Sequence, residues 1–170
     1  MKPLLLVDGY NVIGAWRRAV TGGWTVEESR ERLQRALEDY AGYSGVEVLL
    51  VFDGHLSSRK QRTSEQNAQV TCVFTKQGET ADHYIEAAVA LLSRRRPLQV
   101  ATSDSVEQTV VWGRGAERMS ARELLNELEE IRERRKRAHA PAPVSNRNPL
   151  EERLSPEQRT IMERMRRQKE

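Results

Sequence analysis

Four short apolar runs, each five to eight residues long, lie in the first two thirds of the chain and are separated by longer amphipathic stretches. Nearly continuous apolar runs of this length are typical of strands buried on both faces of a parallel sheet. The expected strands cover residues 4–8, 46–53, 69–74 and 98–104, with a weaker fifth at 110–112. This pattern predicts an α/β domain built on a buried, mainly parallel sheet.

Three helices are expected among these strands. Two of them begin at capping boxes, in which Thr25 or Ser120 is followed three residues later by a glutamate. The other ends before Pro97, which cannot continue a helix. The expected helices cover residues 25–42, 80–95 and 120–137. Helices alternating with strands predict a Rossmann-like fold of three layers, with helices on both faces of the sheet.

Charge and apolar content change near residue 130. Residues 1–129 carry 16 basic and 18 acidic side chains, a net charge of −2, whereas residues 130–170 carry 12 and 7, a net charge of +5. Apolar residues fall from 54 of 129 to 10 of 41, too few for the extension to fold alone. The expected parts are a folded domain at 1–137, a Pro- and Ala-rich linker at 138–152 and a basic helix at 153–170.

Several classes of protein are excluded by composition. No run of about 18 apolar residues occurs, so a membrane-spanning helix is not expected. The first residues lack the apolar core of a secretory signal, so we expect a cytoplasmic protein with no membrane partner. Cys72 is the one cysteine and the three histidines are scattered, which excludes an internal disulfide and a Cys/His zinc site. Any bound metal must therefore have oxygen ligands, and the oligomeric state stays open.

Aspartates stand where ligands usually bind an open α/β sheet, beyond the carboxyl ends of its strands. Asp8, Asp53 and Asp104 each end or follow an expected strand, and Asp82 lies in the first turn of the second helix. Each aspartate alone is explained equally simply as a turn or helix-cap residue. Clustered carboxylates resist ionisation unless a cation compensates, so the set predicts bound Mg²⁺ or Mn²⁺.

A divalent ion of this kind is usually recruited with substrate phosphates, so the residues predict metal-dependent phosphodiester hydrolysis. Asn11 can orient Asp8 or a water through its amide. One alternative is a noncatalytic module that binds RNA or the ribosome through the basic tail. Another is a small-molecule phosphatase, which is less favoured because no Gly-rich phosphate loop is present and DGYN replaces the DxD pattern after the first strand.

Four motifs in combination resemble a known family: DGYN at 8–11, VFDG at 51–54, TADxxI at 80–85 and TSD at 102–104. Residues 3–130 resemble an NYN domain of the PIN-like nuclease superfamily, specifically its bacterial YacP-like branch. The resemblance implies a PIN-like sheet, a divalent-metal site and endonucleolytic cleavage of messenger RNA on the ribosome.

The resemblance also assigns candidate site residues. The catalytic candidates are Asp8, Asn11, Asp53, Asp82 and Asp104, and the metal ligands among them are Asp8, Asp82 and Asp104. Many PIN-like domains carry a further aspartate soon after the fourth-strand acid. Here Ser105, Val106 and Glu107 follow Asp104, which leaves open whether one metal or two are bound.

Two groups of basic residues are candidates to bind RNA phosphates. One group follows the second strand in a polar loop, and the other lies in the C-terminal helix: Arg59, Lys60 and Arg62, and Arg164, Arg166 and Arg167. A solvated loop and a solvated helix face are the simpler interpretations. Trp16, Trp24 and Tyr43 are the aromatic candidates to stack on a base.

Overall fold

The computed structural model describes residues 1–54, 60–103, 115–139 and 155–167. The helices are α1 Gly9–Ala15, α2 Arg17–Thr21, α3 Val26–Ser44, α4 Ala81–Leu92, α6 Ala121–His139 and α7 Pro156–Arg167. The strands are β1 Leu4–Asp8, β2 Glu47–Phe52, β3 Thr63–Asn67, β4 Val70–Phe74, β5 Leu98–Ala101 and β6 Glu117–Met119. The chain separates into two compact units, Met1–Arg137 and Ala138–Glu170.

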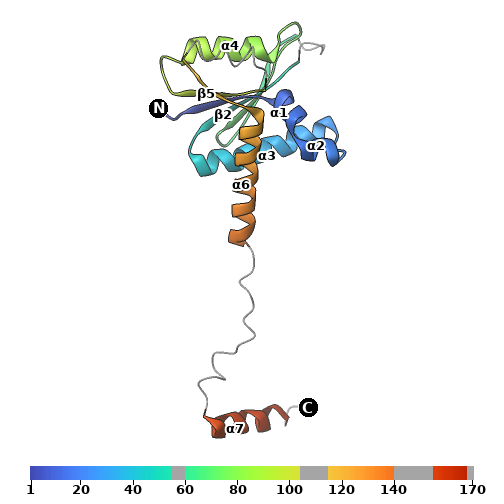
Figure 1. Cartoon of the computed structure of the whole chain (residues 1–170), viewed down its shortest axis with the longest axis vertical. Coiled ribbons are helices and arrows are strands. Elements are labelled where there is room, and N and C mark those ends of the chain that lie inside the picture. Colours follow the sequence, from blue (N-terminus) through green and yellow to red (C-terminus); the bar gives the residue numbers. More distant parts are fainter. Residues whose placement is uncertain (55–59, 104–114, 140–154, 168–170) are drawn as a thin grey trace. The chain divides into compact units, whose positions relative to one another are not determined.

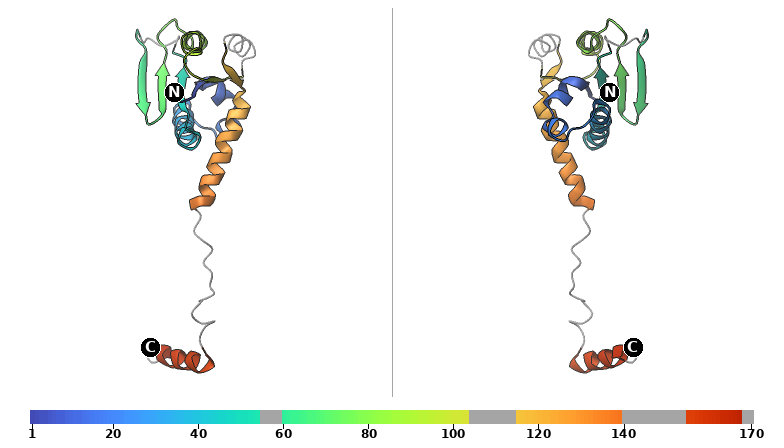
Figure 2. Two further views of the ribbon diagram at one scale, coloured as in Figure 1. Left: turned by 90° about the vertical axis from the view of Figure 1, so that its left-hand side faces the viewer. Right: turned by 90° about the vertical axis from the view of Figure 1, so that its right-hand side faces the viewer.

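The described strands form one six-stranded sheet in the order β3-β4-β2-β1-β5-β6. Strands β3 and β4 pair as an antiparallel hairpin, in green at one edge in Figure 2, and every other pair is parallel. The predicted α/β class with a mainly parallel sheet is confirmed. Strand β1 lies inside the sheet between β2 and β5, so its carboxyl end is flanked by the ends of both neighbours.

Helices cover both faces of the sheet, as Figure 1 shows, with α4 on one side and α1, α3 and α6 on the other. Alternate residues of β1 explain this arrangement. Leu4 and Leu6 pack with residues of α4, whereas Leu5 and Val7 pack with residues of α3 and α6. A strand covered on both faces needs apolar residues at every position, which accounts for the continuous run at 4–8.

The capping signals mark the helix starts correctly. Thr25 and Glu28 form the reciprocal capping box of α3, with hydrogen bonds of 2.8 and 3.1 Å, and Gly45 ends that helix in a left-handed conformation with φ of 73°. Ser120 and Glu123 form the same box ahead of α6. The second expected helix is shorter than predicted, because α4 ends at Leu92.

Other expectations about the elements need correction. The sequence predicts a polar loop where the structure has strand β3. All five side chains of β3 are exposed, so they carry no apolar signal, and the strand joins the sheet through backbone pairing with β4. Strand β6 and the short helices α1 and α2 were not predicted. The expected strand at 110–112 and most of the expected linker at 138–152 lie outside the described residues, and α6 runs two residues into the linker. No helix in the described part of the chain could cross a lipid bilayer.

Candidate active site at the carboxyl edge of the sheet

Asp8 ends the interior strand β1 and is 8% exposed. Its side chain accepts a hydrogen bond of 3.3 Å from the backbone N–H of Asn11, so it also caps helix α1. Gly9 follows Asp8 for a steric reason, because a Cβ there would lie 2.4 Å from a ring carbon of Phe52. The DG pair of the first motif therefore turns the chain sharply from β1 into α1 against the ring of Phe52.

Strand alternation places Asp8 and Asp53 on the same face of the sheet. Leu4 and Leu6 face α4, so Asp8 continues their side of β1. Leu49 and Val51 pack in the same cluster, so Asp53 continues their side just beyond the end of β2. Both carboxylates belong to the carboxyl edge of the sheet on the side covered by α4.

Helix α4 begins at this edge. The Asp53 carboxylate accepts a hydrogen bond of 3.3 Å from the backbone N–H of Ala81, the first residue of α4. Asp82 is the next residue, in the first turn, and Thr80 caps the helix by accepting from His83 N–H at 3.2 Å. The positive end of the helix dipole favours ionised carboxylates at both aspartates.

Thr75 joins the two loops that carry these acids. Its side chain is fully buried, and its hydroxyl accepts from Gly54 N–H and donates to the carbonyl of Glu79, each at 2.8 Å. Gly54 is next to Asp53, and Glu79 lies in the loop that leads into α4. Sequence reasoning missed this residue. The available signal was a threonine directly after the buried strand β4.

Asn11 connects the start of α1 to the loop after β5. Its side-chain oxygen accepts a hydrogen bond of 2.6 Å from the backbone N–H of Ser103. Thr102 is fully buried, and its N–H donates to the Met119 carbonyl at 3.1 Å. Asp104 follows directly in the chain but lies outside the described residues. The structure therefore uses the Asn11 oxygen to hold the loop that leads to Asp104.

Arg62 forms a side-on ion pair with Glu79 at the start of β3. The Arg62 Nε donates to the two Glu79 carboxylate oxygens at 3.0 and 2.7 Å, and the guanidinium lies 5.0 Å from the centre of the Tyr84 ring. The hydrogen bond from Arg62 holds the pKa of Glu79 below its ordinary value. A residue expected to contact RNA phosphates is thus bound to a carboxylate of the chain itself.

The structure describes the other basic candidates only in part. Lys60 is exposed ahead of β3, and Arg164 is exposed on α7. Arg166 and Arg167 belong to α7, but their side chains lie outside the description, as does the whole of Arg59.

The donors at the carboxyl edge are oxygen atoms, which Mg²⁺ and Mn²⁺ prefer. Within residues 1–54, 60–103, 115–139 and 155–167, no three acidic, histidine or cysteine side chains gather closely enough to hold an ion. Mg²⁺ is commonly bound through one or two carboxylates, with water and substrate phosphates completing its ligands. The donor set present at this edge fits an ion bound in that way.

Comparison with known proteins agrees with this fold. Residues 5–167 match the YacP-like NYN domain family. The chain is 44% identical over 133 residues to the uncharacterized protein YacP of Bacillus subtilis, covering 77% of this chain and 78% of that protein.

Solved structures of the same relative are also similar. The crystal structure of Rae1 (YacP) from Bacillus subtilis matches with a TM-score of 0.66 at 43% identity, over 79% of this chain and 78% of that one. A tryptophan-to-leucine mutant of Rae1 matches with a TM-score of 0.67 at 42% identity, over 81% and 80%. The chain therefore belongs to the YacP-like NYN domain family, a branch of the PIN-like nuclease superfamily.

Proposed function

We propose that this protein is a metal-dependent endoribonuclease that hydrolyses RNA phosphodiester bonds and acts on messenger RNA in association with the ribosome. One observation carries the proposal. Asp8 and Asp53 lie on the α4 side of the carboxyl edge, and α4 begins there with Asp82 in its first turn. Membership of a nuclease superfamily makes RNA the expected substrate of this acidic edge.

Asp8, Asp82 and Asp104 would hold Mg²⁺ or Mn²⁺, which supplies water activation and neutralises charge on the reacting phosphate. Asp53 contributes by fixing the start of α4, through its hydrogen bond to Ala81 N–H. Asn11 contributes by holding the loop at Ser103, one residue before Asp104. The low exposure of Asp8 keeps its carboxylate out of bulk water. Its interaction with a cation is stronger there than it would be in water, because the surroundings screen the charges less.

The ribosome enters the proposal through the family resemblance and the basic helix α7. Arg164 and its neighbours Arg166 and Arg167 carry positive charge on a unit separate from the carboxyl edge. Such a helix can bind RNA phosphates of the substrate or of the ribosome. Lys60 is the exposed cation of the loop ahead of β3, and we propose it as a further phosphate contact, with Arg59 and Arg62 beside it in the sequence.

The test compares the wild-type protein with Asp8→Asn on a labelled single-stranded RNA, with Mn²⁺, with Mg²⁺ and with EDTA. Asparagine is also a good N-cap, so α1 keeps an acceptor for Asn11 N–H and the variant is expected to fold. The matched control is Glu47→Gln at the start of β2, which removes a carboxylate that pairs with Arg96.

We expect cleavage that needs the metal, is lost in Asp8→Asn and is retained in Glu47→Gln. A faster reaction with ribosomes present would support the proposed association with the ribosome. Equal rates with and without ribosomes would contradict it. Cleavage by Asp8→Asn at the wild-type rate would contradict the proposed site. RNA binding without cleavage under every metal would favour the noncatalytic binding module.

A further inference from the structure

A hollow of about 230 Å³ lies among helices α2, α3 and α6, on the side of the sheet opposite α4. Among the described acidic residues of the carboxyl edge, Asp8, Asp53 and Asp82 do not line it. Its walls combine aromatic and basic side chains. The lining residues used below are Trp16, Arg18, Trp24, Arg32, Glu129 and Arg132.

Two indoles form the aromatic part of the hollow, and Ala36, Leu125 and Leu128 complete its apolar lining. Trp16 and Trp24 meet edge to face, with ring centres 5.3 Å apart and planes at 87°, and both are half-buried. The exposed Arg32 guanidinium lies 4.3 Å from the ring centre of Trp24. Indole faces and arginine guanidinium groups are the surfaces on which unpaired bases stack.

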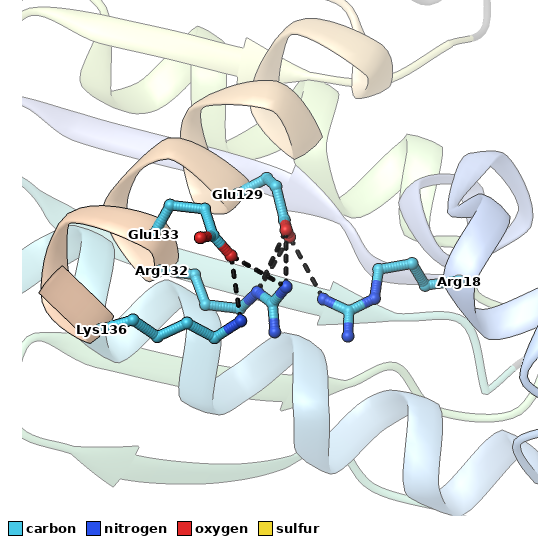
Figure 3. Close-up of polar contacts among 5 residues, drawn as sticks. All are labelled: Arg18, Glu129, Arg132, Glu133 and Lys136. Atoms are coloured by element: carbon cyan, nitrogen blue, oxygen red, sulfur yellow. Dashed lines mark hydrogen bonds and ion pairs between the residues drawn. The ribbon is translucent and has the colours of Figure 1, made fainter. Parts of the chain in front are cut away.

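One wall of the hollow is a charged network between α2 and α6. Figure 3 shows Glu129 between Arg18, which comes from α2, and Arg132 on its own helix. Glu129 accepts from Arg18 at 3.2 Å and from Arg132 at 2.7 Å, and Arg132 also contacts Glu133. The hydrogen bond from Arg132 and the charge of Arg18 hold the pKa of Glu129 below its ordinary value. Glu129 therefore stays ionised and fixes both guanidinium groups beside the indoles.

The hollow carries an excess of positive charge. Four arginines line it, against Asp39 and Glu129, which gives a net charge of +2. Outside the lining, Arg135 pairs with Asp39, whereas Glu31 pairs with Arg35 and Glu133 pairs with Arg132, which reduces the excess to +1. Charge of this sign, concentrated beside stacking surfaces, is complementary to a polyanion with exposed bases.

We propose that the hollow of Trp16, Trp24 and Arg32 is a binding site for single-stranded RNA, in which a base stacks beside the indoles and the arginines contact phosphates. The inference rests on the proposed nuclease function and extends it to the way the substrate is held. Trp16 stands at the end of α1, and Asp8 caps its start. A helix of seven residues spans roughly 10 Å, so a strand of a few nucleotides could reach from one to the other.

The test measures binding of a fluorescently labelled hexauridylate to the full chain in EDTA, with gel analysis to show that the RNA stays intact. The variants are Trp24→Leu and Arg32→Gln. The matched controls are Leu91→Ala, an exposed apolar residue on α4, and Arg95→Gln, an exposed arginine after α4. Intrinsic tryptophan fluorescence is recorded in the same titrations, and thermal unfolding shows whether each variant is folded.

Binding is expected to weaken roughly 5- to 150-fold in Trp24→Leu, the value of one base–aromatic stack, with loss of fluorescence quenching. Arg32→Gln is expected to lower the slope of log Kd against log salt by about 0.7, the value for one phosphate contact. Both controls are expected to bind as the wild type does. If Trp24→Leu does not fold, the salt dependence of Arg32→Gln decides alone, because Arg32 is exposed.

The outcomes separate this inference from the proposed function. RNA binding that depends on Trp24 and Arg32, with no cleavage under any metal, would keep the site and overturn the nuclease. Metal-dependent cleavage with wild-type RNA affinity in Trp24→Leu and Arg32→Gln would keep the nuclease and overturn the site. The second result would leave a protein as the remaining class of occupant.

Discussion

Replacing Thr75 by valine should separate the two loops that carry the acids. Valine keeps the branched shape of the side chain and removes the hydroxyl, so Gly54 N–H and the Glu79 carbonyl lose their 2.8 Å partner. Both hydrogen bonds are part-buried, and a hydrogen bond of this kind contributes about 0.5–1.5 kcal/mol, so the two losses should lower the free energy of unfolding by about 1–3 kcal/mol. For a unit of this size the melting temperature should fall by roughly 3 to 12 °C.

The rate of RNA cleavage by Thr75→Val should fall even at temperatures at which the variant is fully folded. Thr75 does not belong to the acidic set, so we treat it as a positioning residue for Asp53 and Asp82. A misplacement of about 1 Å at reacting groups costs on the order of 100-fold in rate. We expect kcat for RNA cleavage, measured well below the melting temperature, to drop about 10- to 100-fold while KM changes little.

Thr75→Ser is the matched control, because it keeps the hydroxyl and loses one methyl group. It should melt close to the wild type and cleave at a similar rate. The reasoning is refuted if Thr75→Val melts lower but keeps the wild-type kcat, since the hydroxyl would then serve stability alone. It is equally refuted if serine behaves like valine in both assays.

Three further predictions concern single residues. Gly9→Ala should lower the melting temperature, at a cost of about 1–3 kcal/mol, because its Cβ would overlap the Phe52 ring; a normal melting curve would contradict the close approach. Burial raises the pKa of the Cys72 thiol to about 11, so native protein at pH 8 should resist a thiol reagent that labels it rapidly in urea. Arg62→Gln should lower the melting temperature at pH values above about 5. The ion pair lowers the pKa of Glu79 in the folded protein, so it contributes stability at pH values above the unfolded-state pKa of about 4.3. That difference should vanish as pH falls through the lowered pKa, and a difference that persists in acid would exclude the ion pair as its cause.

The elements that could be predicted are those whose signal is local. The run at 4–8 is apolar at every position because both faces of β1 are covered, and Thr25 with Glu28 marks the start of α3 through contacts three residues apart. Strand β3 carries no such signal. Its side chains are all exposed, and only pairing with β4 makes it a strand.

The same distinction applies to the candidate site. The positions of Asp8, Asp53 and Asp82 were predictable because each stands at the end of a strand or the start of a helix. Their supports were not predictable, because they join residues far apart in the sequence. The hydroxyl of Thr75 binds Gly54, which is 21 residues away, and Asn11 binds Ser103, which is 92 residues away.

In the proposed nuclease, the acidic edge must hold RNA, a polyanion that its carboxylates also repel. Arg62 was expected to supply positive charge there, but it is bound side-on to Glu79 and so contributes little net field to a phosphate. Substrate affinity should then depend on other positive charge. Arg32 in the hollow and the arginines of helix α7 carry such charge. If Arg32 and the arginines of α7 are replaced together by glutamine, RNA binding should depend only weakly on salt concentration, because few phosphate contacts would remain.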